Sequence, residues 1–406
     1  MADIMEGVRI LEVAEHTFVP AASAILADWG ADVIKVEHPE RGDAMRGLAS
    51  SGVMPMLGNV HVLLEHSNRG KRSIGIDVQT EAGLELVYKL AETSDVFLTN
   101  KLPAVRDRLK IRAEDIRARN PNIIYVAGTG AGERGPDANR GGYDFLSFWC
   151  RGASAMGSTT TDAEFLTGQP APGYGDSIGG MTIAGGILGA LFHRERTGEA
   201  KTVDVSLLGV GMWAMSPGVA LSLQLDRAWR PGRGGATAPF NPLVGTYRTQ
   251  DGRFLAFSCL QGFRYWAGAC RVVGREDLVE DPRFATPELL AENAGVARDI
   301  LTEIFLASTL DEWRARLEDF EGQWSFAQDT LEVVDDPQTL ANGYIGETAT
   351  ADGTAYRLVT TPVQFEGSPA APKRGPEFNE HCDEILAGLG YDQDTIIELK
   401  VAGVVA

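Results

Sequence analysis

The sequence predicts an α/β protein whose first and larger part is a doubly wound parallel sheet, Rossmann-like in its alternation of strands and helices. Between Val8 and Ala127, short apolar strands alternate with helices of about ten residues, a pattern typical of that fold. A chain of 406 residues also exceeds what one hydrophobic core usually serves. A break rich in proline and glycine at residues 231–235 then precedes a smaller, mixed α/β region. We therefore expect at least two domains.

The elements of the sheet are predicted in chain order from the apolar patterns and their boundaries. They are strand 8–14, helix 21–29 (entered through Pro20 and closed by Gly30), strands 32–37 and 73–78, helix 80–92, strand 96–99, helix 113–119 and strand 123–127. Ligands of such sheets bind beyond the carboxyl ends of the strands. We therefore expect a site among the loops at residues 15–20, 38–46, 100–108 and 128–143.

A helix rich in small residues is predicted at residues 181–192, reached through a polar loop at 157–173. Asp176 and Ser177 both favour the N-cap position, so one of them should begin the helix. A carboxylate at that place is held ionised by unpaired N–H groups and by the helix dipole. The residues alone leave Asp176 as either a cap, which is the more common role, or a nucleophile.

The rest of the chain continues to mix strands and helices. The expected elements are strand 202–208, an apolar segment at 209–225, a hairpin at 246–258 turning at Asp251-Gly252, helices 263–273, 289–305 and 310–318, strand-like spacing from Tyr356, a Pro-rich segment at 369–376 and two terminal helical stretches.

Charge and composition exclude several classes of protein. The net charge of −19 argues against general nucleic-acid binding, although a small anionic ligand needs only a few local cations. No apolar run reaches the roughly 20 residues that cross a bilayer, and Asp3, Glu6 and Arg9 make the N-terminus unlike a signal peptide. The cysteines are far apart and show no CxxC spacing, which favours buried thiols in a reducing compartment: Cys150, Cys259, Cys270 and Cys382. We expect a cytoplasmic protein that binds neither membranes nor nucleic acid.

Two short motifs could suggest other chemistry. Residues 130–135 form a literal GxGxxG after a strand, but Pro136 argues for a continuing loop instead of the helix that a dinucleotide site opens. Residues 175–179 form a literal GxSxG, in which Ser177 would be a hydrolase nucleophile with His193 or His381. The segment before that serine contains two prolines and cannot form the strand that such an elbow requires. None of the histidines has metal-ligand spacing, so no metal site is expected.

Several separated stretches together resemble the class III CoA-transferases, the formyl-CoA and carnitine-CoA transferase (CaiB/BaiF) family. Their order and spacing cover nearly the whole chain. The stretches are residues 7–43, 68–77, 95–100, 142–144, 175–208 and 380–391.

The resemblance implies an enzyme that moves CoA from an acyl-CoA thioester to a free carboxylic acid. The family's catalytic aspartate falls on Asp176, which would form a mixed anhydride and then an aspartyl-CoA thioester, leaving Ser177 as the helix cap. Acyl-CoA is then a substrate, and no tightly bound cofactor is expected. The family also places an oxyanion-binding glycine loop near Gly234-Gly235, where this sequence has only two consecutive glycines.

The resemblance also implies where CoA lies. Thr17 and Phe18 would lie along the pantetheine arm, and Tyr143 beside the substrate carboxylate. Leu48 stands where oxalate-using relatives carry tryptophan, which suggests a more apolar acid. The nucleotide would be held by residues of four loops: His38 (where relatives often carry arginine), Ile76, Asn100 and Arg108.

Other readings of the resemblance remain open. α-Methylacyl-CoA racemases share the fold and need a His–Asp pair, but Tyr143 occupies the position of their histidine, and tyrosine loses its proton only near pH ~10. A non-catalytic CoA-binding scaffold and the GxSxG serine hydrolase are the further alternatives.

The architecture of the family implies an interlocked homodimer in which a small domain is inserted into the large one. We expect a large CoA-binding domain at residues 1–225, a small α/β domain at 226–350 and a return to the large domain at 351–406.

Overall fold

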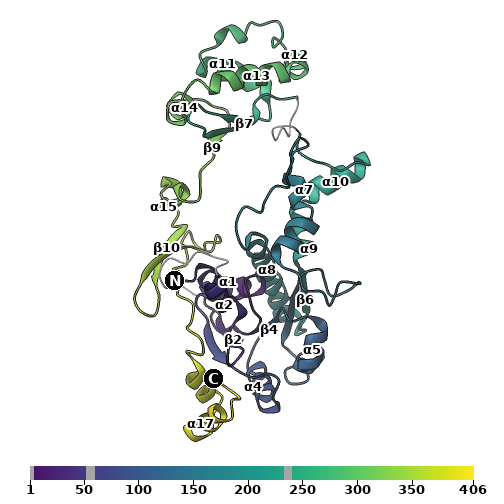
Figure 1. Ribbon diagram of the computed structural model, residues 1–406, viewed down its shortest axis with the longest axis vertical. Coiled ribbons are helices and arrows are strands. Elements are labelled where there is room, and N and C mark those ends of the chain that lie inside the picture. The colour runs from purple at the N-terminus through teal and green to yellow at the C-terminus, as the bar shows by residue number, and fades with distance from the viewer. Residues whose placement is uncertain (1–3, 52–59, 233–239) are drawn as a thin grey trace. The chain divides into compact units, whose positions relative to one another are not determined.

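The computed structural model describes residues 4–51, 60–232 and 240–406 and divides the chain into two compact units (Figure 1). The first unit comprises three segments of chain, Met1–Ala155, Gly168–Gln224 and Pro337–Ala406, and the second comprises Met156–Thr167 and Leu225–Asp336. Gly234 and Gly235 lie outside the described residues.

The first unit is built on a six-stranded sheet in the order β3-β2-β1-β4-β5-β6, in which every neighbouring pair is parallel. The prediction of an α/β fold with a parallel sheet is confirmed. The strands are β1 (Arg9–Val13), β2 (Asp32–Glu37), β3 (Arg72–Gly75), β4 (Val96–Thr99), β5 (Ile124–Thr129) and β6 (Thr202–Ser206). Strand order reverses between β1 and β4, and such a switch point is where open α/β sheets bind ligands.

Side chains of the sheet alternate between two apolar cores because successive strand residues point to opposite faces. One core joins the sheet to α1 (Phe18–Asp28), α8 (Tyr174–Thr197) and α9 (Leu207–Ala214). The other joins it to α4 (Glu81–Glu92) and to the two C-terminal helices. Strands buried on both faces explain the continuous apolar runs in the sequence.

Helices α1 and α8 pack closely because α8 carries glycine at the contact. A Cβ atom on Gly179 would lie 2.3 Å from Cε2 of Phe18, and one on Gly180 would lie 2.7 Å from Cβ of Ala21. The expected tight packing of a small-residue helix is present here. Helix α1 begins at Phe18, so Pro20 lies inside its first turn, where a missing N–H costs no helical hydrogen bond.

The expected cap of α8 was wrong. The N-cap residue is Gly173, whose φ of 71° is left-handed, and the helix begins at Tyr174. Asp176 and Ser177 therefore lie inside the first turn, where the N–H of Ser177 donates to the carbonyl of Gly173 at 2.8 Å. The helix is also longer than the 181–192 expected, since it runs from Tyr174 to Thr197.

The remaining elements of the first unit connect or cover these layers. They are α2 (Ala44–Ser51), α3 (Val62–Asn68), α5 (Pro103–Leu109), α6 (Ala113–Arg117), a π-helix (Phe145–Arg151), α7 (Ser154–Ser158, which ends in the second unit), α10 (Ser216–Leu225, whose last residue is in the second unit), α15 (Pro337–Ala341), β10 (Ile345–Ala349), β11 (Ala355–Val359), α16 (Cys382–Gly388) and α17 (Gln393–Val401).

The C-terminal segment is hydrogen-bonded into the first unit. The N–H of Ser73 donates to Nδ1 of His381 at 3.2 Å, and the N–H of Gly75 donates to Oδ1 of Asn379 at 2.8 Å. The buried carboxylate of Glu65 accepts the N–H of Gly375 at 2.6 Å. The edge strand β3 is therefore completed by residues from the far end of the sequence.

The second unit has an antiparallel sheet in the order β7-β8-β9 with helices around it. Its elements are β7 (Val244–Arg248), β8 (Phe254–Ser258), α11 (Gly262–Val272), α12 (Pro287–Glu292), α13 (Ala294–Phe305), α14 (Leu310–Leu317) and β9 (Trp324–Phe326). The hairpin turns at Gly252, whose φ is 79°, as the sequence predicted. The helix expected at 289–305 is instead two helices that meet at Asn293.

By length and composition, α8 could span a membrane, and α9 with α10 could form a bent span. In this structure α8 is the helix that packs on α1 and the sheet.

Candidate active site

Two contiguous pockets lie at the carboxyl ends of β1 and β4, where the strand order reverses. The first, called the outer pocket, has a volume of about 160 Å³ and is lined by residues following β1, β2, β3 and β4. The second, called the Asp176 pocket, has a volume of about 380 Å³. Glu15, Lys101 and Val105 line both, so a long ligand could extend from one pocket into the other.

Asp176 is half-buried at the inner end of this pair of pockets, in the first turn of α8. Burial and, to a lesser extent, the carboxylate of Asp144 together raise the pKa of its carboxyl to about 7. Burial disfavours the charged form, and a neighbouring like charge does the same. Near neutral pH the group is therefore both ionisable and more basic than an ordinary aspartate.

Asp144 supplies the cap that the first turn of α8 lacks. Its two carboxylate oxygens each lie 3.1 Å from the N–H of Gly175, and its Oδ2 accepts a hydrogen bond from the amide of Gln169. A distant carboxylate thus satisfies an N–H that a local cap would otherwise take. The sequence did not indicate this contact, because the partners are 31 residues apart.

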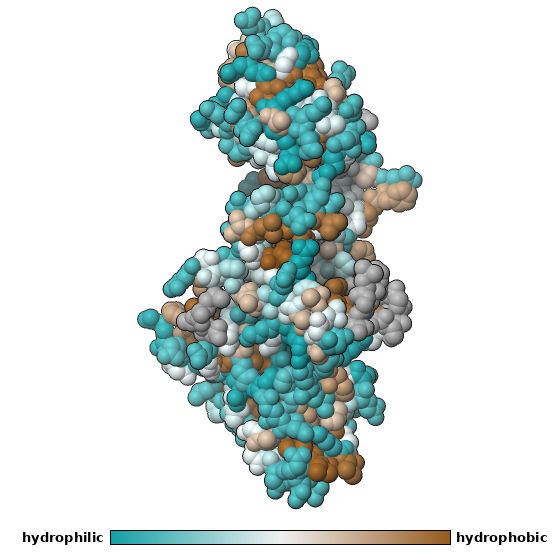
Figure 2. All heavy atoms as spheres, turned by 90° about the vertical axis from the view of Figure 1, so that its left-hand side faces the viewer, coloured by the Kyte–Doolittle hydropathy of each residue, from teal (hydrophilic) through white to brown (hydrophobic). Residues whose placement is uncertain are grey.

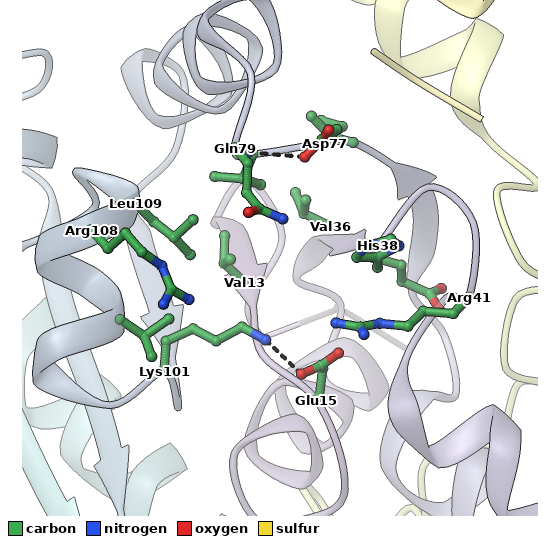
Figure 3. Close-up of a pocket in the computed structure, with 14 residues that line it drawn as sticks. Val13, Glu15, Val36, His38, Arg41, Asp77, Gln79, Lys101, Arg108 and Leu109 are labelled. Carbon is green, nitrogen blue, oxygen red and sulfur yellow. Dashed lines mark hydrogen bonds and ion pairs between the residues drawn. The ribbon is translucent and has the colours of Figure 1, made fainter. Parts of the chain in front are cut away.

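The outer pocket combines an apolar wall with cations. Figure 3 shows Lys101 and Arg108 from one segment and Arg41 from another reaching toward the centre of the cavity. Lys101 pairs with Glu15 at 2.5 Å, between Nζ and Oε2. The apolar part of the lining consists of Val13, Val36, Ile76, Val78, Val105 and Leu109.

The structure gathers most of the predicted site residues around these two pockets. His38, Ile76 and Arg108 line the outer pocket, and Phe18, Asn100, Tyr143 and Asp176 line the Asp176 pocket.

Asn100 has a second, structural role, and two further residues singled out from the sequence lie outside both pockets. Asn100 braces the loop after β1, since its Oδ1 accepts the N–H of Glu15 at 3.2 Å and its Nδ2 donates to the carbonyl of Glu15 at 2.6 Å. Thr17 is buried as the N-cap residue of α1 and lines neither pocket. Leu48, on α2, also lines neither.

Sequence reasoning missed Arg41, Lys101 and His16 as pocket residues. All three lie in loops that follow predicted strands, so their position past a strand end was the available signal. Their residue types alone are common on protein surfaces and carried no further information.

The two short motifs have structural roles. In the GxGxxG loop, Gly132 and Gly135 have φ of 109° and 93°, and Glu133 pairs with Arg106, so the loop opens no helix. In the GxSxG segment, the Ser177 hydroxyl donates to the carbonyl of Gly173 at 2.8 Å. Its Oγ lies 3.1 Å from Nε2 of a histidine on α3, His66, and not beside either histidine that the hydrolase alternative required.

A buried ionic cluster lies beneath the loop after β1. Lys35 pairs with Glu12 and Asp43 at 2.8 and 2.7 Å, and Lys71 pairs with Glu12 at 2.8 Å; all four side chains are fully buried. Burial lowers the pKa of Lys71 to about 8, only partly offset by Glu12. Burial also opposes the charge of Lys35, but Asp43 and Glu12 together raise its pKa.

No group of three or more histidine, cysteine or acidic side chains in the described part of the chain could hold a metal ion. The four cysteines are free thiols.

The fold and these pockets belong to an enzyme class that handles CoA thioesters: the chain is a member of CoA-transferase family III, whose model matches residues 5–382. Among curated proteins, it is 30% identical to (R)-2-hydroxy-4-methylpentanoate CoA-transferase of Clostridioides difficile, over 99% of both chains. It is 28% identical to cinnamoyl-CoA:phenyllactate CoA-transferase of Clostridium sporogenes, over 98% of this chain and 96% of the relative.

A solved structure has the same fold. A CAIB/BAIF family protein from Brucella suis is 28% identical and superposes with a TM-score of 0.82, over 96% of this chain and all of that one (100%). The resemblance expected from the sequence is thus confirmed at the level of the family, and the chain is a family III CoA-transferase.

Proposed function

We propose that this enzyme transfers CoA from an acyl-CoA thioester to a carboxylic acid with Asp176 as the nucleophile. The observation that carries the proposal is a half-buried carboxylate, with its pKa raised to about 7, at the inner end of a cavity whose outer end is lined by cations. A basic carboxylate is the better nucleophile toward a thioester, and burial limits its competition with water.

The outer pocket suits the nucleotide end of CoA. Ile76 and its apolar neighbours offer a wall for the adenine, and Arg41, Lys101 and Arg108 offer charge to the phosphates. His38, which lines the same pocket, would add a further polar contact. The pantetheine arm would then pass the residues shared by both pockets and reach Phe18, with Thr17 beneath it.

The reaction proceeds through two kinds of covalent intermediate. A carboxylate oxygen of Asp176 attacks the thioester carbonyl, a C–O bond forms, and the C–S bond breaks to release CoA thiolate. The thiolate attacks the aspartyl carbonyl of the resulting anhydride, which frees the first acid and leaves CoA on Asp176. The incoming carboxylate reverses these steps and leaves as the new acyl-CoA. Thioester energy is conserved because water takes no part.

The acceptor is proposed to be a monocarboxylic acid with an apolar body. Lys101 is the one lysine or arginine among the described residues that line the Asp176 pocket, and it is paired with Glu15. A second carboxylate on the substrate would find no unpaired cation there. The two relatives above are named for acids of this kind, 2-hydroxy-4-methylpentanoate and phenyllactate.

We also propose a cytoplasmic homodimer. Large apolar side chains are exposed on α8 to α10, with Phe192 65%, Trp213 80% and Leu223 80% exposed. Figure 2 shows further apolar groups on the face that carries α15 and the β10–β11 hairpin, where Leu340 and Val359 are exposed. Apolar patches of this kind are typical of surfaces that a second chain covers. The interlocked arrangement remains the expectation drawn from the family.

Intact-mass measurement tests the function. Incubation with an acyl-CoA should add an acyl or CoA adduct that hydroxylamine removes, and Asp176→Ala should abolish both the adduct and CoA exchange. Ser177→Ala is the matched control in the same turn and should retain much of the exchange. Loss of activity in Ser177→Ala with retention in Asp176→Ala would instead support the hydrolase.

The racemase alternative has one favourable observation, since His16 lines the same pocket as Asp176. A racemase would exchange the α-proton of a 2-methylacyl-CoA in deuterated water without any second acid. Absence of that exchange, with CoA transfer present, would exclude it.

A further inference from the structure

His16 has a backbone conformation that few residues other than glycine adopt. Its φ is 68°, in the left-handed region, where a side chain with a Cβ atom is disfavoured. Residues held in such conformations persist when their surroundings determine them, and they cluster at functional sites.

The conformation is held by the buried ionic cluster. The N–H of His16 donates to Oδ1 of Asp43 at 3.0 Å, and the same oxygen accepts the N–H of Met45 at 2.8 Å. The other oxygen of Asp43 pairs with the fully buried Lys35 at 2.7 Å. A charged, buried and hydrogen-bonded carboxylate thus fixes the backbone of one pocket residue.

The imidazole lines the Asp176 pocket. Its ring meets that of Tyr143 edge-on, with centroids 5.5 Å apart and planes at 90°. Neither ring nitrogen of His16 is hydrogen-bonded to any described residue, whereas the nearby donors of Lys101 and Asn100 are both engaged by Glu15. The imidazole N–H is therefore available to a ligand beside Asp176.

We propose that His16 is a further catalytic residue, whose imidazole N–H donates a hydrogen bond to the carbonyl oxygen of the acyl group under attack. The inference rests on the proposed function. When an oxygen of Asp176 bonds to the carbonyl carbon, the π electron pair moves to the carbonyl oxygen, and His16 stabilises that negative charge. The pair returns as the C–S bond breaks, and the imidazole keeps its proton throughout. A preset donor in a half-buried pocket is an effective means of such stabilisation.

His16→Gly separates this role from a structural one. Glycine adopts the left-handed conformation without strain, so the variant should keep or raise the melting temperature of the protein. Removing one oxyanion donor should lower kcat on the order of 100-fold, with a much smaller change in KM. The rate of hydroxylamine-sensitive adduct formation should fall by the same factor. Added imidazole should restore part of the rate in His16→Gly and none in Asp176→Ala.

Glu366→Gly is the matched control, because Glu366 also has a left-handed φ, 54°, and is exposed and lines neither pocket. It should leave kcat unchanged. A folded His16→Gly with wild-type kcat would overturn the proposal, and so would a lowered melting temperature with no rescue by imidazole. The proposal would also be overturned if the wild-type enzyme exchanged the α-proton of a 2-methylacyl-CoA and His16→Gly did not, because His16 would then act as a base. Absence of any adduct in the wild-type enzyme would instead refute the proposed function.

Discussion

The carboxylate of Asp144 accepts the backbone N–H of Gly175, with both of its oxygens 3.1 Å from the nitrogen. A Cβ atom at position 175 would lie 2.4 Å from Oδ1 of Asp144 and 2.3 Å from Cγ of Phe148, so only glycine allows this approach. The contact places a negative charge one residue before Asp176. It opposes the stabilisation that a helix N-terminus would otherwise give to the Asp176 carboxylate.

Replacing Asp144 should therefore change the pH dependence of the reaction. Asp144→Asn keeps an oxygen for the Gly175 N–H but removes the charge, so the pKa of Asp176 should fall from about 7. The acidic limb of the profile of kcat/KM against pH should move to lower pH. A limb that stays in place in a folded variant would contradict the electrostatic role of Asp144.

Asp176 should also make stability depend on pH. Its folded-state pKa of about 7 lies above the ordinary value of 3.8, so the folded chain binds more protons than the unfolded chain between those pH values. Stability should consequently fall as pH rises from 4 to 7. Asp176→Asn should remove this loss. At pH 8 its free energy of unfolding should therefore exceed that of the wild-type protein by on the order of 1–2 kcal/mol, after allowance for solvent screening. Urea unfolding of both proteins at pH 5 and pH 8 measures the difference.

The glycines of α8 should respond differently to alanine. In Gly179→Ala the new methyl group would meet the ring of Phe18, which should cost about 1–3 kcal/mol. A Cβ atom on Gly185 would have no neighbouring atom within 4 Å, so Gly185→Ala should gain up to about 1 kcal/mol from helix propensity. The midpoints of thermal unfolding of the two variants and of the wild-type protein measure these effects. Equal effects would contradict the close packing of α8 on α1.

The outer pocket should affect substrate binding more than the chemical steps. Arg108→Ala should raise KM for acyl-CoA about tenfold and leave kcat within about a factor of three, because a charge-assisted phosphate contact is worth about 1.5–3 kcal/mol. Arg117→Ala, elsewhere on the same segment of chain, is a suitable comparison because Arg117 lines neither pocket. An unchanged KM in Arg108→Ala would argue that the nucleotide binds elsewhere.

Glu12 should be essential to stability. Glu12→Gln leaves Lys71 without its carboxylate in a fully buried position, and breaking such a pair should cost about 3–5 kcal/mol. Glu6→Gln changes an exposed carboxylate in the same region and should have little effect. The midpoints of denaturant unfolding measure the loss of stability in both variants. Similar midpoints for the two would show that the buried ionic cluster contributes little to stability.

The sequence predicted the parallel sheet well because β1 to β5 are short, largely apolar segments separated by helices with local boundary signals, such as Thr80, which caps α4. It placed His38 and Arg108 in loops at the strand ends, and the family resemblance pointed to Ile76 and Asp176; all four line the two pockets. The start of α8 was missed because its cap comes from Asp144, a tertiary contact. His16 was missed for a similar reason, since a distant carboxylate holds its backbone.

The dependence of β3 on Asn379 and His381 has a consequence for synthesis. Gly75 and Asn379 are separated by 304 residues, and a ribosome adding about 5–20 residues per second needs roughly 15–60 seconds to cover that distance. Throughout this interval the nascent chain presents a sheet edge with unpaired N–H groups, the type of surface to which foreign strands add. Chaperone occupancy during translation should therefore be concentrated on that edge.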